Sequence, residues 1–283
     1  MTRSIKRWKS RFAERFRRVK VYYFFYLKRL HQTSHHLSKP VIVSLTSYPE
    51  RYNVLHLTLM SLLIQDVQAD TLVLWVHHKD FDLLPDAVVR LQRKGLVIEV
   101  TDEDIKSYTK LIPSLRKYKD CFLVTADDDV CYSREWLEVL LEGYVESSKE
   151  VVCHRAHLIR LDENGHPLPY ADWEFDTTLS VADPRVFPTG VAGVLYPPQC
   201  FDPEVLNVSA LVQLAPDADD IWFYSMFRRN RFLGRKVEGR FAVKTWSGTQ
   251  NNALWRKNLT KKQNDRQLHN IIEVYGKPSF DLS

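Results

Sequence analysis

Residues 121–132 read CFLVTADDDVCY, an apolar run that ends in three consecutive aspartates. The run predicts a buried strand, which places Asp127, Asp128 and Asp129 at its carboxyl end, where open α/β sheets bind their ligands. Adjacent carboxylates repel one another unless a cation or hydrogen-bond donors neutralise them, and hard oxygen ligands suit Mg²⁺ or Mn²⁺. The stretch therefore predicts a metal and an anionic ligand. The alternative is a solvated acidic turn that caps the next helix at Ser133.

The sequence before this stretch alternates between strand-like and helix-like patterns. Short apolar runs with β-branched residues predict strands at 41–45, 71–76 and 96–100. Apolar residues at helical spacing predict helices at 54–64, 84–94 and 109–118, with Gly95 as the stop of the second and Pro113 limiting where the third begins. Near-continuous apolar strands that alternate with helices predict a parallel sheet covered on both faces.

Four motifs follow one another along the chain: SLTSYPER at 44–51, KLIP at 110–113, TADDDVCY at 125–132 and DDIW at 219–222. A lone Asp-x-Asp carries little information, but the order and spacing of all four do. Over roughly residues 40 to 275 the chain resembles nucleotide-sugar glycosyltransferases of the GT-A fold, in particular bacterial enzymes that build capsular or lipopolysaccharide glycans. This resemblance implies an α/β fold with a Rossmann-like, mostly parallel central sheet flanked by helices.

The resemblance also implies a metal-dependent active site that uses a nucleoside-diphosphate sugar with Mn²⁺ or Mg²⁺. It makes Asp129 the direct metal ligand, and it places Asp127 at the metal or, with Asp128, toward the ribose or a metal-bound water. It also makes Asp220, in preference to Asp219, the general base of an inverting transfer. The alternative for this second pair is a set of carboxylates in a first helical turn, which the helix dipole favours.

The loop after the first strand is where the family binds the base and ribose, so the resemblance assigns Thr46, Tyr48 and Arg51 to nucleotide binding. Tyr48 would stack on the base and Arg51 would meet a phosphate or the base edge. A proline-containing turn with Arg51 on the surface is an equal alternative. The resemblance assigns Lys110 to binding of the donor phosphate. The alternative is that Lys110 is a solvated helix residue.

The downstream half reads as an acceptor-binding module. We predict a strand at 151–156, an extended segment at 188–196 and helices at 221–227 and 258–276. Pro216 and Asp217 are predicted to begin the helix whose apolar side is 221–227. Gly190 and Gly193 read as ordinary bends. The predicted division is an N-terminal extension at 1–39, a nucleotide-sugar-binding half at 40–150, and an acceptor-binding half with a C-terminal helix at 151–283.

Several aromatic and imidazole side chains have both a functional and a structural interpretation. His154 and His157 would line the donor cleft or complete the metal shell, although a histidine beside a strand is more often hydrogen-bonded structure. Tryptophans would stack on sugar rings or close the core edge; the candidates are Trp173, Trp222 and Trp246. The polar run at 247–252 predicts a loop that closes over substrate.

The first 40 residues hold 12 lysines and arginines and one acidic residue, Glu14, whereas the rest of the chain is acidic overall. Aromatic and apolar residues recur there at steps of three or four, which predicts a helix with one apolar face; they are Trp8, Phe12, Phe16, Val19 and Tyr23. A disordered basic leader and a nucleic-acid arm are alternatives. We favour docking on an anionic membrane surface, because the apolar face is continuous and enzymes that resemble this one act on lipid-linked acceptors.

Composition limits the remaining function classes. A chain of 283 residues with 45% hydrophobic content can bury one large core or two modest ones, and it shows no membrane-length apolar run and no secretory-signal pattern. The four scattered cysteines predict free thiols, so we expect a cytoplasmic protein associated peripherally with the inner face of the membrane. A dehydrogenase lacks its G-x-G-x-x-G motif. The alternatives kept are a nucleotidyltransferase, although its basic phosphate loop is missing, and an inactive glycan-binding or membrane-associated module.

Overall fold

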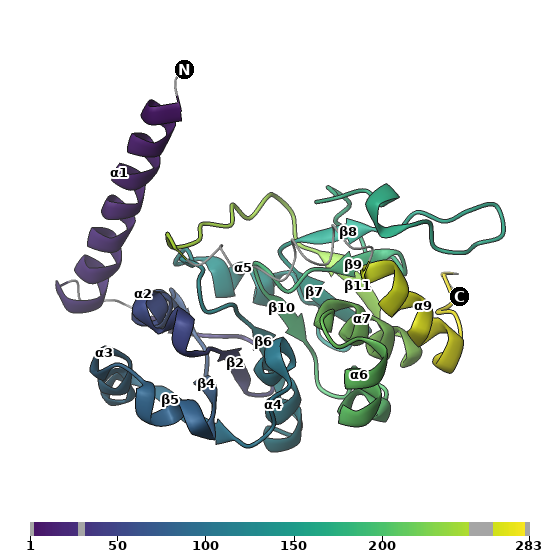
Figure 1. Cartoon of the computed structure of the whole chain (residues 1–283), viewed down its shortest axis with the longest axis horizontal. Helices are drawn as coiled ribbons and strands as arrows, with labels where there is room; N and C mark the ends of the chain where they lie inside the picture. The colour runs from purple at the N-terminus through teal and green to yellow at the C-terminus, as the bar shows by residue number, and fades with distance from the viewer. Residues whose placement is uncertain (1–2, 28–31, 249–262, 281–283) are drawn as a thin grey trace.

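The computed structural model describes residues 3–27, 32–248 and 263–280. A seven-stranded sheet forms the centre of the molecule, with the strands in the order β11-β7-β10-β6-β2-β4-β5 (Figure 1). Its strands are β2 (Val41–Thr46), β4 (Thr71–His77), β5 (Leu96–Thr101), β6 (Phe122–Thr125), β7 (Glu150–Cys153), β10 (Val194–Tyr196) and β11 (Leu233–Lys236). Strand β10 alone is antiparallel to its two neighbours, β6 and β7, and the other pairs in this sheet are parallel. Two small sheets pair β1 (Thr33–Ser34) with β3 (Val67–Gln68) and β8 (Ala156–Leu158) with β9 (Val186–Pro188).

Helices cover both faces of the central sheet because successive strand residues point to opposite sides. In β2, Val41, Val43 and Leu45 join one buried cluster and Ile42 joins the other. The first cluster includes side chains of α2 (Tyr52–Leu63), α3 (Asp86–Val89) and α5 (Trp136–Glu142). The second includes α4 (Ile112–Lys117), α6 (Val208–Leu214), α7 (Asp219–Arg229) and α9 (Gln263–Tyr275). The predicted α/β fold class is therefore confirmed.

Short 3-10 helices replace parts of two predicted elements. The helix predicted at 84–94 is α3 followed by a 3-10 helix at Arg90–Lys94, and it ends at Gly95, whose left-handed φ of 100° suits a glycine stop. A 3-10 helix at Lys106–Lys110 precedes α4, which carries Pro113 in its first turn. Other 3-10 helices span Pro49–Arg51, His78–Leu83, Tyr170–Asp172 and Pro203–Leu206.

Three predicted boundaries in the downstream half are wrong. The strand predicted at 151–156 divides into β7, which pairs with β10 and β11, and β8, which pairs with β9. The segment predicted at 188–196 divides in the same way into β9 and β10 around a turn at Gly190–Gly193. Helix α7 begins at Asp219 rather than at Pro216, since the backbone N–H of Asp217 is held by the Gln267 side chain, 2.9 Å away.

The N-terminal helix α1 (Arg3–Tyr22) projects from one end of the molecule and continues into a π-helical turn at Tyr23–Leu27 (Figure 1). Its second half packs on the body, where Val21 is buried beside α2. Of the helices in the described parts of the chain, none has both the length and the apolar character required to cross a bilayer.

Candidate functional site

The predicted site residues meet at one edge of the central sheet. Strands β2 and β6 are parallel neighbours, so the residues that follow them emerge side by side at their carboxyl ends. Strand β10 runs the other way, with Val194 opposite Thr125, so the turn that precedes β10 reaches the same edge. The first turn of α7 completes the site through Asp219 and Asp220.

Arg51 and Ser47 hold two of the three consecutive aspartates. The Arg51 guanidinium lies 2.5 Å from Asp129 and 3.2 Å from Asp128, and the Ser47 hydroxyl donates to Asp128 at 2.6 Å. Asp128 and Asp129 are buried, and helix α5 begins at Trp136. The solvated acidic turn capping a helix at Ser133 is therefore wrong, and so is a surface position for Arg51, whose side chain is 13% exposed. Burial raises the pKa of Asp128 to about 7 despite the nearby Arg51.

Lys110 joins the two acidic motifs. Its Nζ lies 3.0 Å from Asp219 and 3.4 Å from Asp127, and the residue is buried. Burial alone would lower the pKa of Lys110, but the charges of Asp219, Asp127 and Asp220 raise it well above its ordinary value. The alternative of a solvated helix residue is therefore wrong. Lys110 is a permanent positive charge between carboxylates that stand about ninety residues apart in the sequence.

Serine hydroxyls fix the backbone that carries Lys110. The Ser44 hydroxyl, on β2, donates to the Lys110 carbonyl at 2.6 Å and lies 2.8 Å from the Ser114 hydroxyl. Ser114 in turn accepts from the indole of Trp75 at 2.7 Å. All these groups are buried. The lysine is thus held by a fully paired polar network, which restricts where its ammonium group can move.

Asp220 receives a backbone hydrogen bond that the sequence did not predict. The N–H of Gly190 donates to Asp220 Oδ1 at 2.9 Å. A Cβ on Gly190 would lie 2.8 Å from that oxygen and 2.9 Å from Lys110 Nζ, so a side chain here would displace the carboxylate or the ammonium group. Gly190 is therefore not the ordinary bend that we predicted. Burial, and then the charge of Asp219, raise the pKa of Asp220 to about 7.

The residues predicted to bind the nucleotide differ in whether their side chains are free to contact a ligand. Tyr48 is 39% exposed, its hydroxyl accepts from Arg51 Nε at 3.2 Å, and the Arg51 guanidinium lies over its ring, 5.7 Å from the centroid. The Thr46 hydroxyl instead donates to the Trp75 carbonyl at 3.0 Å, at the end of the β2–β4 pair. The structure brings Arg51 and Lys110 to the aspartates and leaves Thr46 engaged by the sheet.

A strap at residues 240–247 lies beside the aspartate motif. The backbone N–H of Trp246 donates to the Asp129 carbonyl at 2.9 Å, and the N–H of Cys131 donates to the Lys244 carbonyl at 2.8 Å. On the other side, the hydroxyl of buried Tyr132 accepts from the Asp127 N–H at 2.7 Å. Sequence reasoning missed Tyr132 because a tyrosine three residues after Asp129 also suits a core position. These bonds fix the backbone from which the carboxylates project.

The remaining candidates have structural roles. Burial lowers the pKa of His154 to about 4 and that of His157 to about 3, so both are neutral at physiological pH. His154 bonds the Trp136 carbonyl and His157 accepts from the Asp176 N–H. Neither imidazole is hydrogen-bonded to Asp127–Asp129 or to Asp219–Asp220.

The three candidate tryptophans are buried, and their indole N–H groups bond to Leu168, Val205 and Thr58. Stacking of Trp173, Trp222 or Trp246 on a sugar is therefore wrong. Most of the predicted closing loop, residues 249–252, lies outside the described residues, as does the beginning of the helix predicted at 258–276.

The carboxylate oxygens at this site suit a hard divalent cation whose coordination shell is completed by water and by substrate phosphates. In the described parts of the chain, no three His, Cys, Asp or Glu side chains form a ready metal cluster. Mg²⁺ and Mn²⁺ sites need no such cluster, because they keep several waters and use one or two carboxylates together with substrate phosphates. Asp127 and Asp129 provide oxygen ligands of this kind, and burial raises the pKa of Asp127, which marks a carboxylate short of neutralising charge.

Comparisons with known proteins show the fold. No protein-family model matches the sequence, and no curated protein matches it. Among solved structures, the chain is similar to the mannosyltransferase PcManGT from Pyrobaculum calidifontis, solved in complex with GDP-Man and Mn²⁺, at 12% identity and a TM-score of 0.52. That match covers 96% of this chain and 74% of the other.

Two further structures are more distant. The inositol-1-phosphate CTP transferase from T. maritima gives a TM-score of 0.41 at 10% identity over 84% of this chain and 98% of its own. Glucosyl-3-phosphoglycerate synthase from Mycobacterium tuberculosis, with Mn²⁺, UDP and phosphoglyceric acid, gives 0.32 at 13% identity over 44% of this chain and 51% of its own.

Proposed function

We propose that this chain is a metal-dependent glycosyltransferase that moves a sugar from a nucleoside-diphosphate donor to a hydroxyl of a lipid-linked or polysaccharide acceptor in bacterial surface glycan synthesis, with inversion at the anomeric carbon. The observation that carries this proposal is the meeting of Asp127–Asp129 and Asp219–Asp220 around Lys110 at the carboxyl edge of the sheet. The shared fold with a mannosyltransferase solved with GDP-Man and Mn²⁺ supports it.

In this proposal residues 40–150 bind the donor. Asp129 and Asp127 hold the cation, and Asp128 faces the ribose or a metal-bound water. The cation, when bound, supplies Lewis-acid stabilisation of the charge that develops on the diphosphate leaving group. Tyr48 stacks on the base, Thr46 lines the nucleotide loop, and Arg51 and Lys110 provide fixed positive charge for the phosphates.

Residues 151–283 supply the acceptor side and the base. A base must accept the proton of the attacking hydroxyl, and a carboxylate works best when its pKa lies near the operating pH. Asp220 meets this requirement, because burial and Asp219 raise its pKa to about 7. The Gly190 N–H fixes one carboxylate oxygen and leaves the other for the acceptor. Buried like charges of this kind destabilise a fold, so keeping them argues against an inactive binding module.

A thermal-shift panel of nucleoside diphosphates and nucleotide sugars tests the donor class. We expect one nucleotide sugar to raise Tm in the presence of Mn²⁺ but not in EDTA, since a ligand at 100 times its Kd stabilises by about 2.7 kcal/mol. Transfer by that donor should release a nucleoside diphosphate. Release of pyrophosphate from a nucleoside triphosphate would instead identify a nucleotidyltransferase, and no response to any nucleotide would contradict the proposal.

We also propose that α1 docks on an anionic membrane surface. Trp8, Phe12 and Phe16 follow one another at four-residue steps and are 67%, 63% and 65% exposed, and the Trp8 and Phe12 rings stack at 5.7 Å. Exposed aromatic area of this size on a basic helix suits the headgroup region of anionic lipid. Deletion of the whole of α1 is a poor test, because Glu14 and Val21 of this helix pack on the body.

Sedimentation with vesicles tests the docking. Replacing Trp8, Phe12 and Phe16 with serine should reduce co-sedimentation with phosphatidylglycerol vesicles at least tenfold, because burial of each ring contributes about 1.5–3 kcal/mol. Turnover on a soluble acceptor should not change. Phe81→Ser is the matched control, since Phe81 is exposed on the 3-10 helix His78–Leu83. Equal co-sedimentation of the triple variant and the control would refute docking through α1.

A further inference from the structure

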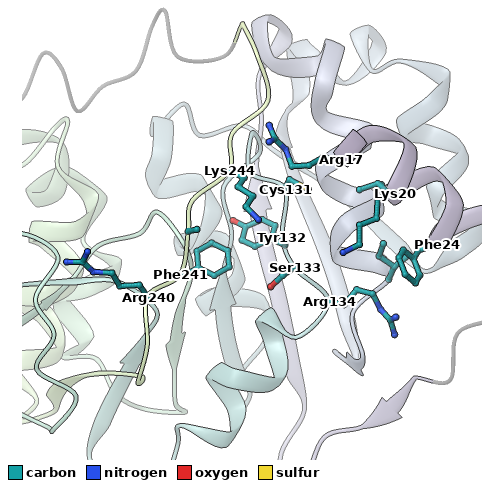
Figure 2. Close-up of a pocket in the computed structure, with 13 residues that line it drawn as sticks. Arg17, Lys20, Phe24, Cys131, Tyr132, Ser133, Arg134, Arg240, Phe241 and Lys244 are labelled. Carbon is teal, nitrogen blue, oxygen red and sulfur yellow. The ribbon is translucent and has the colours of Figure 1, made fainter. Parts of the chain in front are cut away.

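A cavity of about 240 Å³ lies between α1, the segment 131–134 that follows the aspartate motif, and the strap (Figure 2). Figure 2 shows lining residues from all three segments, with Arg240 extending away from the others. The cavity is separate from the Lys110 centre: neither Lys110 nor any of the five aspartates lines it. The rest of the lining is partly apolar, through Phe24, Val21 and Phe241.

The cavity has a strongly positive lining. Five basic residues line it and no acidic residue does; they are Arg17, Lys20, Arg134, Arg240 and Lys244. Two of these have carboxylate partners outside the lining, since Arg134 pairs with Asp66 and Arg240 lies 3.5 Å from Asp176. In the described chain the other three basic residues form no salt bridge. Arg17 donates to the Thr245 carbonyl at 3.3 Å, and Lys20 lies 5.8 Å from the centroid of the Phe24 ring. Cations without a carboxylate partner that gather around one cavity repel each other unless an anion joins them.

Hydrogen bonding also leaves donors unused at this place. The Nε atoms of Arg17 and Arg134 are buried, and neither has a hydrogen-bond partner among the described residues. A buried N–H without an acceptor costs about 1–3 kcal/mol, so such groups usually mark a missing partner.

Cys131 lies among these cations. It lines the cavity together with Arg17, Lys20 and Lys244, which come from α1 and from the strap. An anion held by these cations would lie beside the thiol.

We propose that this cavity binds a phosphate-bearing anion, carried either by a soluble phosphate or diphosphate or by a lipid headgroup. Arginine forks and lysine ammonium groups are the usual protein ligands of phosphate. The bound anion would join α1 and the strap to the segment that carries the metal aspartates, since Tyr132 lines the cavity and also accepts from the Asp127 N–H. The site goes beyond the proposed sugar transfer and does not depend on it.

Protection of Cys131 from alkylation tests the site on the full chain. The protein is treated with iodoacetamide in EDTA, so that no metal-dependent nucleotide site contributes, and labelling of each cysteine is followed by peptide mass spectrometry. Inorganic pyrophosphate, inorganic phosphate and phosphatidylglycerol vesicles are the three probes, each compared with sodium chloride at equal ionic strength. Cys121, which is also partly exposed but lies at the other end of β6, is the internal control.

We expect at least a threefold slowing at Cys131 and none at Cys121. Protection by pyrophosphate or phosphate identifies a soluble source, and protection by phosphatidylglycerol but not phosphatidylcholine vesicles identifies a headgroup. In the double variant Lys20→Gln, Lys244→Gln the probes should no longer slow alkylation of Cys131. Lys94 is an exposed lysine elsewhere, and in Lys94→Gln the slowing should be the same as in the parent protein. Unprotected Cys131 with all three probes, or full protection in the double variant, would overturn the proposal.

Discussion

Asp220→Asn is expected to lower kcat for sugar transfer about a thousandfold while leaving the KM for the nucleotide sugar within a few-fold of the parent value. General-base catalysis contributes about 10² to 10⁴ in rate, and an amide cannot take the proton of the acceptor hydroxyl. The amide oxygen can still accept from the Gly190 N–H, so the local structure should survive. Initial rates with saturating donor and varied acceptor measure the effect.

The pH profile separates a catalytic carboxylate from a structural one. The base must be ionised, so kcat/KM of the parent should fall as pH drops below about 7, the pKa of Asp220. The negative charge of Asp219 contributes to that raised pKa, so Asp219→Asn should move the acidic limb to lower pH. A limb that does not move in this variant, or an Asp220→Asn enzyme with near-normal turnover, would remove Asp220 from the mechanism.

Asp220→Asn should also increase the free energy of unfolding at high pH. A carboxyl group whose pKa is raised by folding binds its proton more tightly in the native state, so the ionised form destabilises the protein above the unfolded pKa, fully so above about pH 7. Asp220→Asn removes this penalty, and we expect a gain of about 1–2 kcal/mol at pH 8 that vanishes near pH 4. Loss of rate together with gained stability would exclude simple unfolding as the cause.

Asp129→Asn is expected to lower metal-dependent transfer at least a hundredfold and to abolish the Mn²⁺-dependent Tm increase caused by the donor. An amide is a weaker ligand than a carboxylate for a hard cation and no longer offsets its charge. Arg51 keeps Asp128 as a partner at 3.2 Å, so the nucleotide loop should remain in place. Transfer and thermal shift are both measured over a Mn²⁺ titration.

Asp86→Asn is the matched control for this variant, since the Asp86 side chain is 88% exposed on α3. It should behave as the parent in both assays. Undiminished transfer by the Asp129 variant, or by the parent protein in EDTA, would show that no divalent ion held by this motif takes part.

The sequence predicted the sheet because its strands are apolar on both faces and separated by helical periods. It also predicted that Asp127–Asp129 and Asp219–Asp220 belong together, but only through the family resemblance. It could not show that Lys110 joins them, because that contact depends on the Ser44 and Ser114 hydroxyls beneath it. Gly190 was missed for a similar reason: a glycine between strands signals a bend equally well, and only the approach of Asp220 reveals what a side chain would strike.

The reversed direction of β10 has an evolutionary consequence. Because β10 enters the sheet from the edge at which its neighbours leave, the Gly190–Gly193 turn is anchored on both sides by short paired strands, β9 and β10. Residues added to or removed from that turn would change the surroundings of Asp220 without shifting the register of the parallel strands β2 and β6. In the proposed function, such a change would alter which acceptor is used and would keep the same sugar nucleotide.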